Sequence, residues 1–180
     1  FEPGTMDHAM YGADLLFGPE QMIRRFVKDP SFDQLICVAI AKHSDFKLEG
    51  IEDERTLLHA RLIRDADKLD NCRVKLEESM ETLLDMDEKT VGASPISPKV
   101  WESCKAEKSV LSADRKTGMD YWMSYLALYF DINFPETYQI IKEQDYIRRI
   151  AERVPYSRED TKEKVAYTVK KLEEKMQVQP

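Results

Sequence analysis

The chain has little glycine and few cysteines, and each shortage excludes a class of protein. Six Gly and eight Pro in 180 residues, beside 42% hydrophobic and 34% charged residues, exclude a collagen-like, low-complexity or disordered chain. The three cysteines, Cys37, Cys72 and Cys104, are odd in number and far apart, so neither a zinc knuckle nor a disulfide framework fits them. This cysteine usage predicts a reducing, cytoplasmic location.

The sequence also lacks long apolar runs and an excess of positive charge. No apolar run approaches the roughly 18 residues of a membrane span, and no basic segment followed by an apolar one opens the chain. We therefore expect no membrane partner. Asp and Glu outnumber Lys and Arg by 34 to 27, which gives a formal net charge of −7. A general nucleic-acid binder needs a basic surface, so that function is not expected.

The hydrophobic pattern has a helical period, with no alternating strand pattern and no internal repeat. It predicts an all-α globular bundle of roughly eight helices. The length suits one domain over residues 1–180 better than two very small ones. An alternative is a boundary near residues 86–98, which read as the clearest loop. We favour one domain, because neither half has an obvious self-sufficient set of helices.

A run of alternating acidic and basic side chains, residues 64–71, interrupts an otherwise apolar helix. Ala60, Ile63, Asp67 and Asp70 fall on one helical line, so two carboxylates follow two apolar residues on one face. Buried carboxylates are costly unless they are paired or bound to a cation. The pattern leaves two interpretations open: a cation site, or a helix end whose face turns to solvent.

Two of the three histidines lie at the ends of apolar helical stripes. His8 follows Asp7, a predicted helix N-cap, and His43 ends the stripe of a later helix. A lone histidine at such a position is usually a hydrogen-bonded core residue. Two of them, with an inward-pointing carboxylate, favour a site for a metal or a phosphate. His59 lies among charged residues, and we interpret it as structural.

Three short segments resemble motifs of the HD-domain superfamily, metal-dependent phosphohydrolases with a helical core. Residues 62–70 (Leu-Ile-Arg-Asp-Ala-Asp-Lys-Leu-Asp) resemble its last motif, and residues 7–13 and 39–43 match two histidine motifs in order and rough spacing. Residues 94–98 and 118–122 are similar to the C-terminal half of a bacterial subfamily of uncharacterised HD-domain proteins. The resemblance therefore spans nearly the whole chain.

This resemblance implies a hydrolase that acts on a nucleotide or another small phosphate ester through a metal-activated water. The implied cofactor is a divalent metal ion: Mn, Fe, Mg or Zn. Asp67 matches the closing metal ligand of the family. His8 and His43 match histidines that bind a second metal or a substrate phosphate in some members.

The same motif supplies three further candidates. Asp65 and Lys68 are implied as a supporting acid and a phosphate contact, so the predicted catalytic residues are Asp65, Asp67 and Lys68. Lys68 and Arg64 would offset charge on the phosphate oxygens beside His8 and His43. For Arg64, a solvated salt bridge is the favoured interpretation.

The sequence departs from the family at one place. In the family, a first metal-binding His and an adjacent His-Asp pair precede the segment that matches residues 7–13, and this sequence has neither. The chain starts at Phe1, so we expect these ligands in an upstream segment, in another chain, or nowhere. The alternative function is a non-catalytic helical module that retains the HD fold and binds a nucleotide, another ligand or a protein partner. Homo-oligomerisation is left open.

Overall fold

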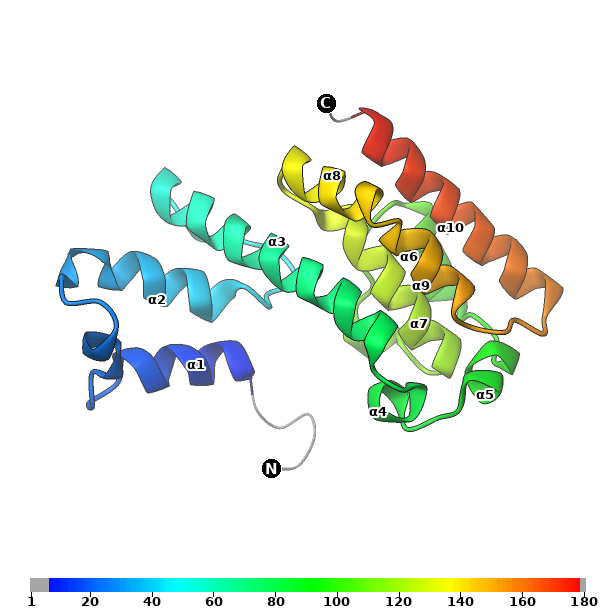
Figure 1. Ribbon diagram of the computed structural model, residues 1–180, viewed down its shortest axis with the longest axis horizontal. Helices are drawn as coiled ribbons and strands as arrows, with labels where there is room; N and C mark the ends of the chain where they lie inside the picture. The colour runs from blue at the N-terminus through cyan, green and yellow to red at the C-terminus, as the bar shows by residue number, and fades with distance from the viewer. Residues whose placement is uncertain (1–6, 179–180) are drawn as a thin grey trace. The chain divides into compact units, whose positions relative to one another are not determined.

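The computed structural model describes residues 7–178, and over that range the chain is all-α with no strand (Figure 1). The predicted fold class is confirmed. Within the same range, no helix combines the length and apolar character that crossing a membrane requires. The chain divides into two compact units between Asp67 and Lys68, inside a long helix.

The N-terminal unit contains two short 3-10 helices and three longer helical segments. Its elements are α1 (His8–Phe17), η1 (Met22–Arg25), η2 (Pro30–Phe32), α2 (Asp33–Lys42) and the first half of α3 (Glu54–Glu77). Asp7 caps α1 as predicted, since its carboxylate accepts the backbone N–H groups of Ala9 and Met10. The start of α1 is therefore fixed by local chemistry.

Helices α1 and α2 run antiparallel and side by side (Figure 1). Their contact is made by small residues, because Ala9, Ala13 and Ala39 are almost completely buried. A Cβ added at Gly12 would lie 3.7 Å from Ile40, an ordinary packing distance. Small side chains let the two helices approach closely, and they leave most bulky apolar residues of this unit outside its core.

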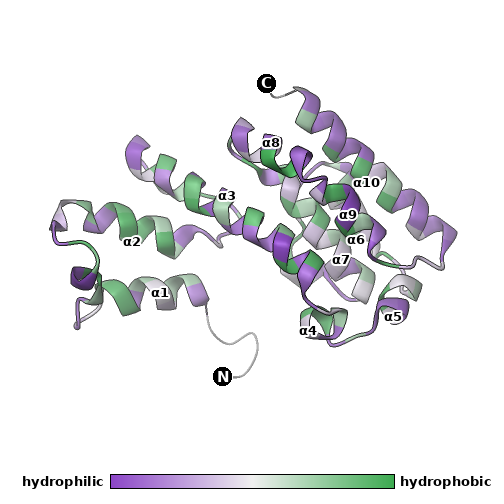
Figure 2. Cartoon of the chain, viewed as in Figure 1, coloured by the Kyte–Doolittle hydropathy of each residue, from purple (hydrophilic) through white to green (hydrophobic). Residues whose placement is uncertain are grey.

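The C-terminal unit continues α3 and contains the remaining helices of the described residues. They are α4 (Met80–Leu84), α5 (Glu88–Ala93), α6 (Pro98–Lys105), η3 (Ser112–Asp114), α7 (Gly118–Ala127), η4 (Leu128–Asp131), α8 (Pro135–Glu143), α9 (Tyr146–Glu152) and α10 (Glu159–Val178). Helix α7 lies in the core, with Trp122, Met123 and Leu126 inaccessible to solvent. Figure 2 shows α10 mostly in purple, as expected for a helix that buries one stripe and exposes charged residues.

The segment 86–98, predicted as a loop, contains helix α5, so that prediction is wrong for its middle part. Asp87 accepts the backbone N–H groups of Lys89 and Thr90, and this cap starts a short helix despite the nearby glycine. A Cβ at Gly92 would overlap the Pro155 carbonyl oxygen, so glycine permits that close approach. The division between units falls in α3 instead, and the single domain stays a prediction.

The buried carboxylate of Asp120 joins the two segments that carry the C-terminal resemblance. It accepts the backbone N–H and the hydroxyl of Ser97 at 2.7 and 2.6 Å, and the backbone N–H groups of Lys116 and Thr117. The Thr117 hydroxyl in turn donates to the Pro95 carbonyl at 2.6 Å. Four donors compensate the desolvation of one carboxylate, so these residues serve the fold.

Candidate functional site

The structure brings His8 and His43 together in the N-terminal unit. His8 is the first residue of α1 and His43 is the C-cap of α2, so the antiparallel pairing of these helices places both rings at one end. Their Nε2 atoms lie 3.1 Å apart, and the rings meet edge to face with centroids 5.0 Å apart. The two residues are 35 positions apart in sequence.

A backbone contact fixes the orientation of the His43 ring. Its Nδ1 lies 2.7 Å from the carbonyl oxygen of Ile40, which can only accept a hydrogen bond. Nδ1 therefore carries a proton, and Nε2 is the atom directed at His8. Metal-binding histidines commonly donate their second ring nitrogen to a carbonyl in this way.

The geometry of the pair is compatible with two uses. Two nitrogen ligands at 2.0–2.1 Å from a tetrahedral zinc ion would lie about 3.3 Å apart, close to the observed spacing. The same spacing also suits a hydrogen bond between two neutral rings, which would tie α1 to α2. The donor set thus fits half of a metal site.

A third protein ligand is not grouped with this pair. Among residues 7–178, no three His, Cys, Asp or Glu side chains are arranged to hold one metal ion together. Asp67 is exposed on α3 and does not form a three-ligand group with the two histidines. Asp65, two residues earlier, is buried. Of the three predicted metal ligands, the structure therefore brings His8 and His43 together, and Asp67 is not grouped with them.

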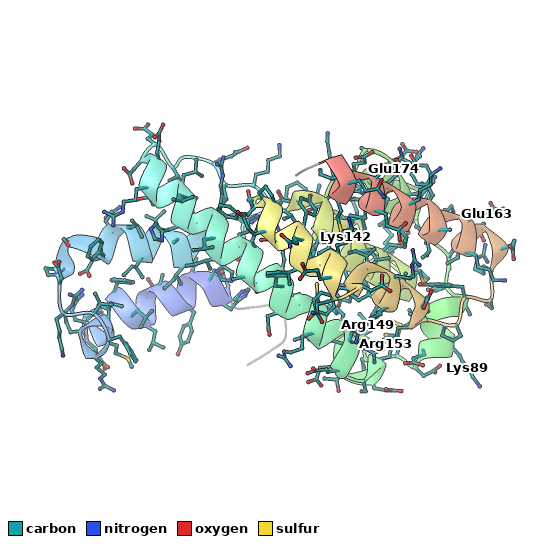
Figure 3. All side chains as sticks on the ribbon, turned by 45° about the horizontal axis from the view of Figure 1, so that its top comes forward. Lys89, Lys142, Arg149, Arg153, Glu163 and Glu174 are labelled. Carbon is teal, nitrogen blue, oxygen red and sulfur yellow. The ribbon has the colours of Figure 1, made fainter. Side chains whose placement is uncertain are left out.

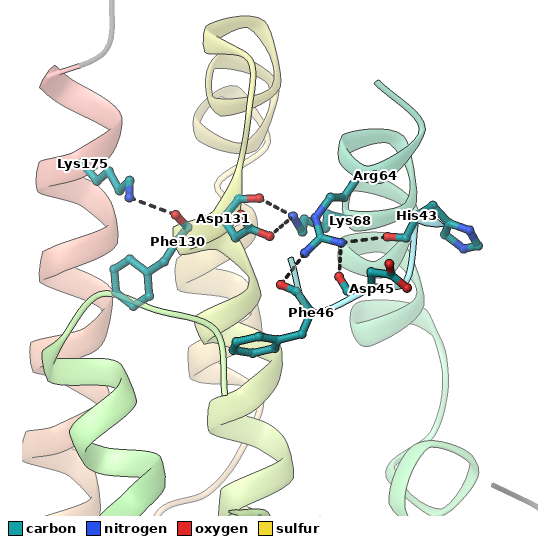
Figure 4. Close-up of polar contacts among 8 residues, drawn as sticks. All are labelled: His43, Asp45, Phe46, Arg64, Lys68, Phe130, Asp131 and Lys175. Carbon is teal, nitrogen blue, oxygen red and sulfur yellow. Dashed lines mark hydrogen bonds and ion pairs between the residues drawn. The ribbon is translucent and has the colours of Figure 1, made fainter. Parts of the chain in front are cut away.

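Arg64 has a role that the sequence did not indicate. Its side chain is 7% exposed, so the expectation that it lies in solvent is wrong. The guanidinium donates to the main-chain carbonyls of His43 and Phe46, each at 3.0 Å, and to that of Asp45 (Figure 4). A cation at the C-terminal end of a helix satisfies orphan carbonyls and offsets the helix dipole. Arg64 thus fixes the end of α2 that carries His43.

Lys68 lies in the C-terminal unit and is 4% exposed. Its ammonium contacts the Asp131 carboxylate at 2.9 Å and also donates to the main-chain carbonyl of Asp131 (Figure 4). Lys175 donates to the neighbouring carbonyl of Phe130 at 2.9 Å. Two lysines therefore cap the end of η4. Lys68, predicted to bind phosphate, makes both of these contacts with Asp131, and its binding of phosphate stays a prediction.

Arg153 repeats this use of a cation in the C-terminal unit. Arg153 directly follows α9 (Figure 3). Its guanidinium donates to the carbonyls of Lys75 and Glu78 at the C-terminal end of α3. Sequence reasoning missed all of these caps. The usable signal was a basic residue at a position where the helical pattern predicts burial, because such a cation needs an acceptor.

The C-terminal unit also has a surface groove of about 460 Å³ between α9 and α10. Val154, Val165 and Val169 line it, together with charged side chains such as Lys162 and Lys170. None of the predicted site residues borders this groove. It is therefore separate from the candidate site.

The cysteines are poorly suited to nucleophilic chemistry. Burial raises the pKa of the Cys72 thiol to about 11 and that of Cys104 to about 12. The pKa of Cys37 is also raised, mainly by burial and to a smaller extent by the nearby negative charges of Asp14 and Asp33. A thiol with a raised pKa is protonated near neutral pH and reacts slowly.

Comparisons of the chain with protein-family models, with curated proteins and with solved structures found no match. The resemblance to HD-domain proteins therefore rests on the motif residues themselves. The chemistry of the His8–His43 pair is the structural observation that bears most directly on it.

Proposed function

We propose that this protein is a metal-dependent phosphohydrolase, similar to HD-domain enzymes, that acts on a nucleotide or another small phosphate ester. The observation that supports the proposal is the pair of imidazoles, His8 and His43, with Nε2 atoms 3.1 Å apart. Neutral imidazole nitrogens are common ligands for divalent transition metals, and protonated ones donate to phosphate oxygens.

In this proposal each residue has a stated part. His8 and His43 offer two nitrogen donors to an ion, or two N–H groups to a phosphate, and Asp67 supplies a charged oxygen donor. A bound divalent ion would polarise a phosphoryl oxygen and lower the pKa of a water ligand. Arg64 acts through His43, because it donates to the main-chain carbonyl of that residue and so positions the ring.

Metal titration tests the histidine pair directly. We would titrate Co²⁺, Mn²⁺ and Zn²⁺ into wild type, His8→Ala and His43→Ala, with heat and the Co²⁺ absorption spectrum as readouts. His59→Ala is the matched control, because His59 is a half-buried histidine on α3 that is not part of the pair. We expect each pair variant to weaken affinity about tenfold or more and the control to leave it unchanged. Equal affinity in all four proteins would contradict the assignment.

Activity tests the carboxylate. We would screen nucleotides and generic phosphomonoesters with Mn²⁺, Mg²⁺, Fe²⁺ and Zn²⁺, and compare wild type with Asp67→Ala. Asp70→Ala is the control, since Asp70 is exposed on the same helix and paired with Arg73 at 3.0 Å. We expect Asp67→Ala to abolish hydrolysis while the helix stays folded. Full activity in that variant would show that another carboxylate, such as Asp65, has this role.

The second candidate is a non-catalytic helical module that binds a ligand or a protein. Two observations favour it: the side chains of Arg64 and Lys68, both predicted to bind phosphate, contact other groups of the protein. Arg64 donates to main-chain carbonyls, and Lys68 pairs with Asp131. Equilibrium dialysis of labelled nucleotides beside the activity screen separates the two functions. Nucleotide binding without hydrolysis, in protein that also binds metal, would favour the module.

A further inference from the structure

Large apolar side chains are unusually exposed in the N-terminal unit. Ten such residues are exposed in the described part of the chain, and seven of them precede residue 68. These seven are Met10, Tyr11, Leu15, Phe26, Phe46, Leu58 and Leu62. Contiguous exposed apolar surface is typical of interaction sites, whereas scattered single residues need no explanation.

Four of these exposed apolar residues form two pairs, one on α1 and one on α3. On α1, Tyr11 and Leu15 are one turn apart and 49% and 45% exposed. On the first half of α3, Leu58 and Leu62 are one turn apart and 51% and 54% exposed. Each pair has the spacing with which a helix presents a continuous apolar stripe to a partner.

The α1 face is bordered by acidic side chains, whereas the α3 face is bordered by two arginines and one glutamate. The α1 face is flanked by Asp7 and the exposed Asp14, and α1 contains no Lys or Arg. The α3 face is flanked by Arg61, which is exposed and makes no ion pair with the residues that the structure describes. Arg55 lies one turn before Leu58, beside Glu54. Residues that border each stripe could therefore form ion pairs across a contact between the two faces.

We propose that α1 of one molecule packs on the first half of α3 of a second copy, and that the reverse contact forms at the same time. A twofold dimer of this kind contains two identical contacts between the α1 face and the α3 face. It pairs Tyr11 and Leu15 with Leu58 and Leu62, and Asp14 with Arg61. Because each molecule carries both the α1 face and the α3 face, one twofold dimer buries both faces of both molecules.

The dimer is tested by the concentration dependence of the oligomeric state in protein that contains residues 1–180. Sedimentation velocity and light scattering over a dilution series should show a reversible dimer. The double variant Leu58→Glu/Leu62→Glu should weaken it by about tenfold or more, because it buries charge at the centre of the contact. Leu111→Glu/Ile140→Glu, two exposed apolar residues of the C-terminal unit, is the matched control and should leave it unchanged.

Exchange of the charges tests the pairing itself. Asp14→Arg and Arg61→Asp should each weaken the dimer about two- to fivefold, the range of an exposed ion pair. The double variant should recover most of the loss. Circular dichroism of every variant shows whether the helices persist, and a loss of dimer counts only in folded protein.

Three results would overturn the proposal. They are a monomer at every concentration, a dimer that Leu58→Glu/Leu62→Glu leaves intact, and a double charge variant no tighter than the single ones. A monomer would mean that these faces meet a different partner. None of these variants alters His8, His43 or Asp67, so the outcome is independent of the proposed phosphohydrolase function.

Discussion

The ammonium of Lys68 lies 2.9 Å from the carboxylate of Asp131 and also donates to the main-chain carbonyl of the same residue. The lysine is almost completely buried, whereas the carboxylate is partly exposed. The contact joins α3 to the end of η4, 63 residues later in the chain. A lysine drawn into the protein in this way needs both partners to compensate for lost hydration.

Lys68→Met should therefore reduce stability, because the carbonyl and the carboxylate of Asp131 both lose a donor. We expect a loss of about 1–3 kcal/mol in the free energy of unfolding, measured by urea denaturation. Lys99→Met is the matched control, since Lys99 is highly exposed and pairs with Asp114 at 3.1 Å. The control should change stability by less than about 0.5 kcal/mol. An equal effect in both variants would show that burial does not distinguish these lysines.

Arg64→Lys should loosen the end of α2, since an ammonium cannot reach the three carbonyls that the planar guanidinium contacts. Hydrogen exchange should become faster at residues 43–48, and stability should fall by about 1–2 kcal/mol. Arg61→Lys, an exposed change on the same helix, controls for the loss of helix propensity. Unchanged exchange at the end of α2 would mean that Arg64 does not hold this segment.

Asp120→Asn should be strongly destabilising, because an amide replaces one carboxylate oxygen with a donor that faces other donors. We expect a loss of about 3 kcal/mol in the free energy of unfolding. Ser97→Ala removes only the hydroxyl contact and should cost about 1 kcal/mol. Thermal melts of the two variants should therefore differ clearly. Equal losses would contradict the view that the carboxylate organises several donors.

The buried thiols predict a pH dependence at the alkaline end. The pKa values of about 11 for Cys72 and about 12 for Cys104 lie above the unfolded value of about 8.5. The folded state therefore retains protons that the unfolded state loses, and stability is fully present below about pH 8.5 and falls as pH rises towards 11. Cys72→Ala and Cys104→Ala should each make this fall less steep than in wild type.

Alkylation at neutral pH offers a second readout of the same burial. Iodoacetamide should modify Cys37 before the other two cysteines, because Cys37 is only half-buried. Cys72 and Cys104 should react only after unfolding in urea. Mass spectrometry of tryptic peptides gives the order. Equal rates at the three positions in native protein would contradict the burial described here.

The sequence by itself determined the local structure of this protein. The helical period predicted an all-α fold, and Asp7 before a run of helix-compatible residues predicted the start of α1. Both depend on neighbours within one turn of the chain, so a linear reading suffices. Helix α5 was missed, because Gly, Ser and Pro indicated a loop while the cap at Asp87 favoured a helix.

The tertiary structure alone decided which side chains meet. His8 and His43 were singled out separately, but only the packing of α1 on α2 through alanines brings their rings into contact. The partners of Arg64 are carbonyls 18 to 21 residues away, and that of Lys68 is 63 residues away. Hydrophobic periodicity shows which side of a helix is buried. It carries no information on which distant backbone group lies there, because that depends on how the helices pack.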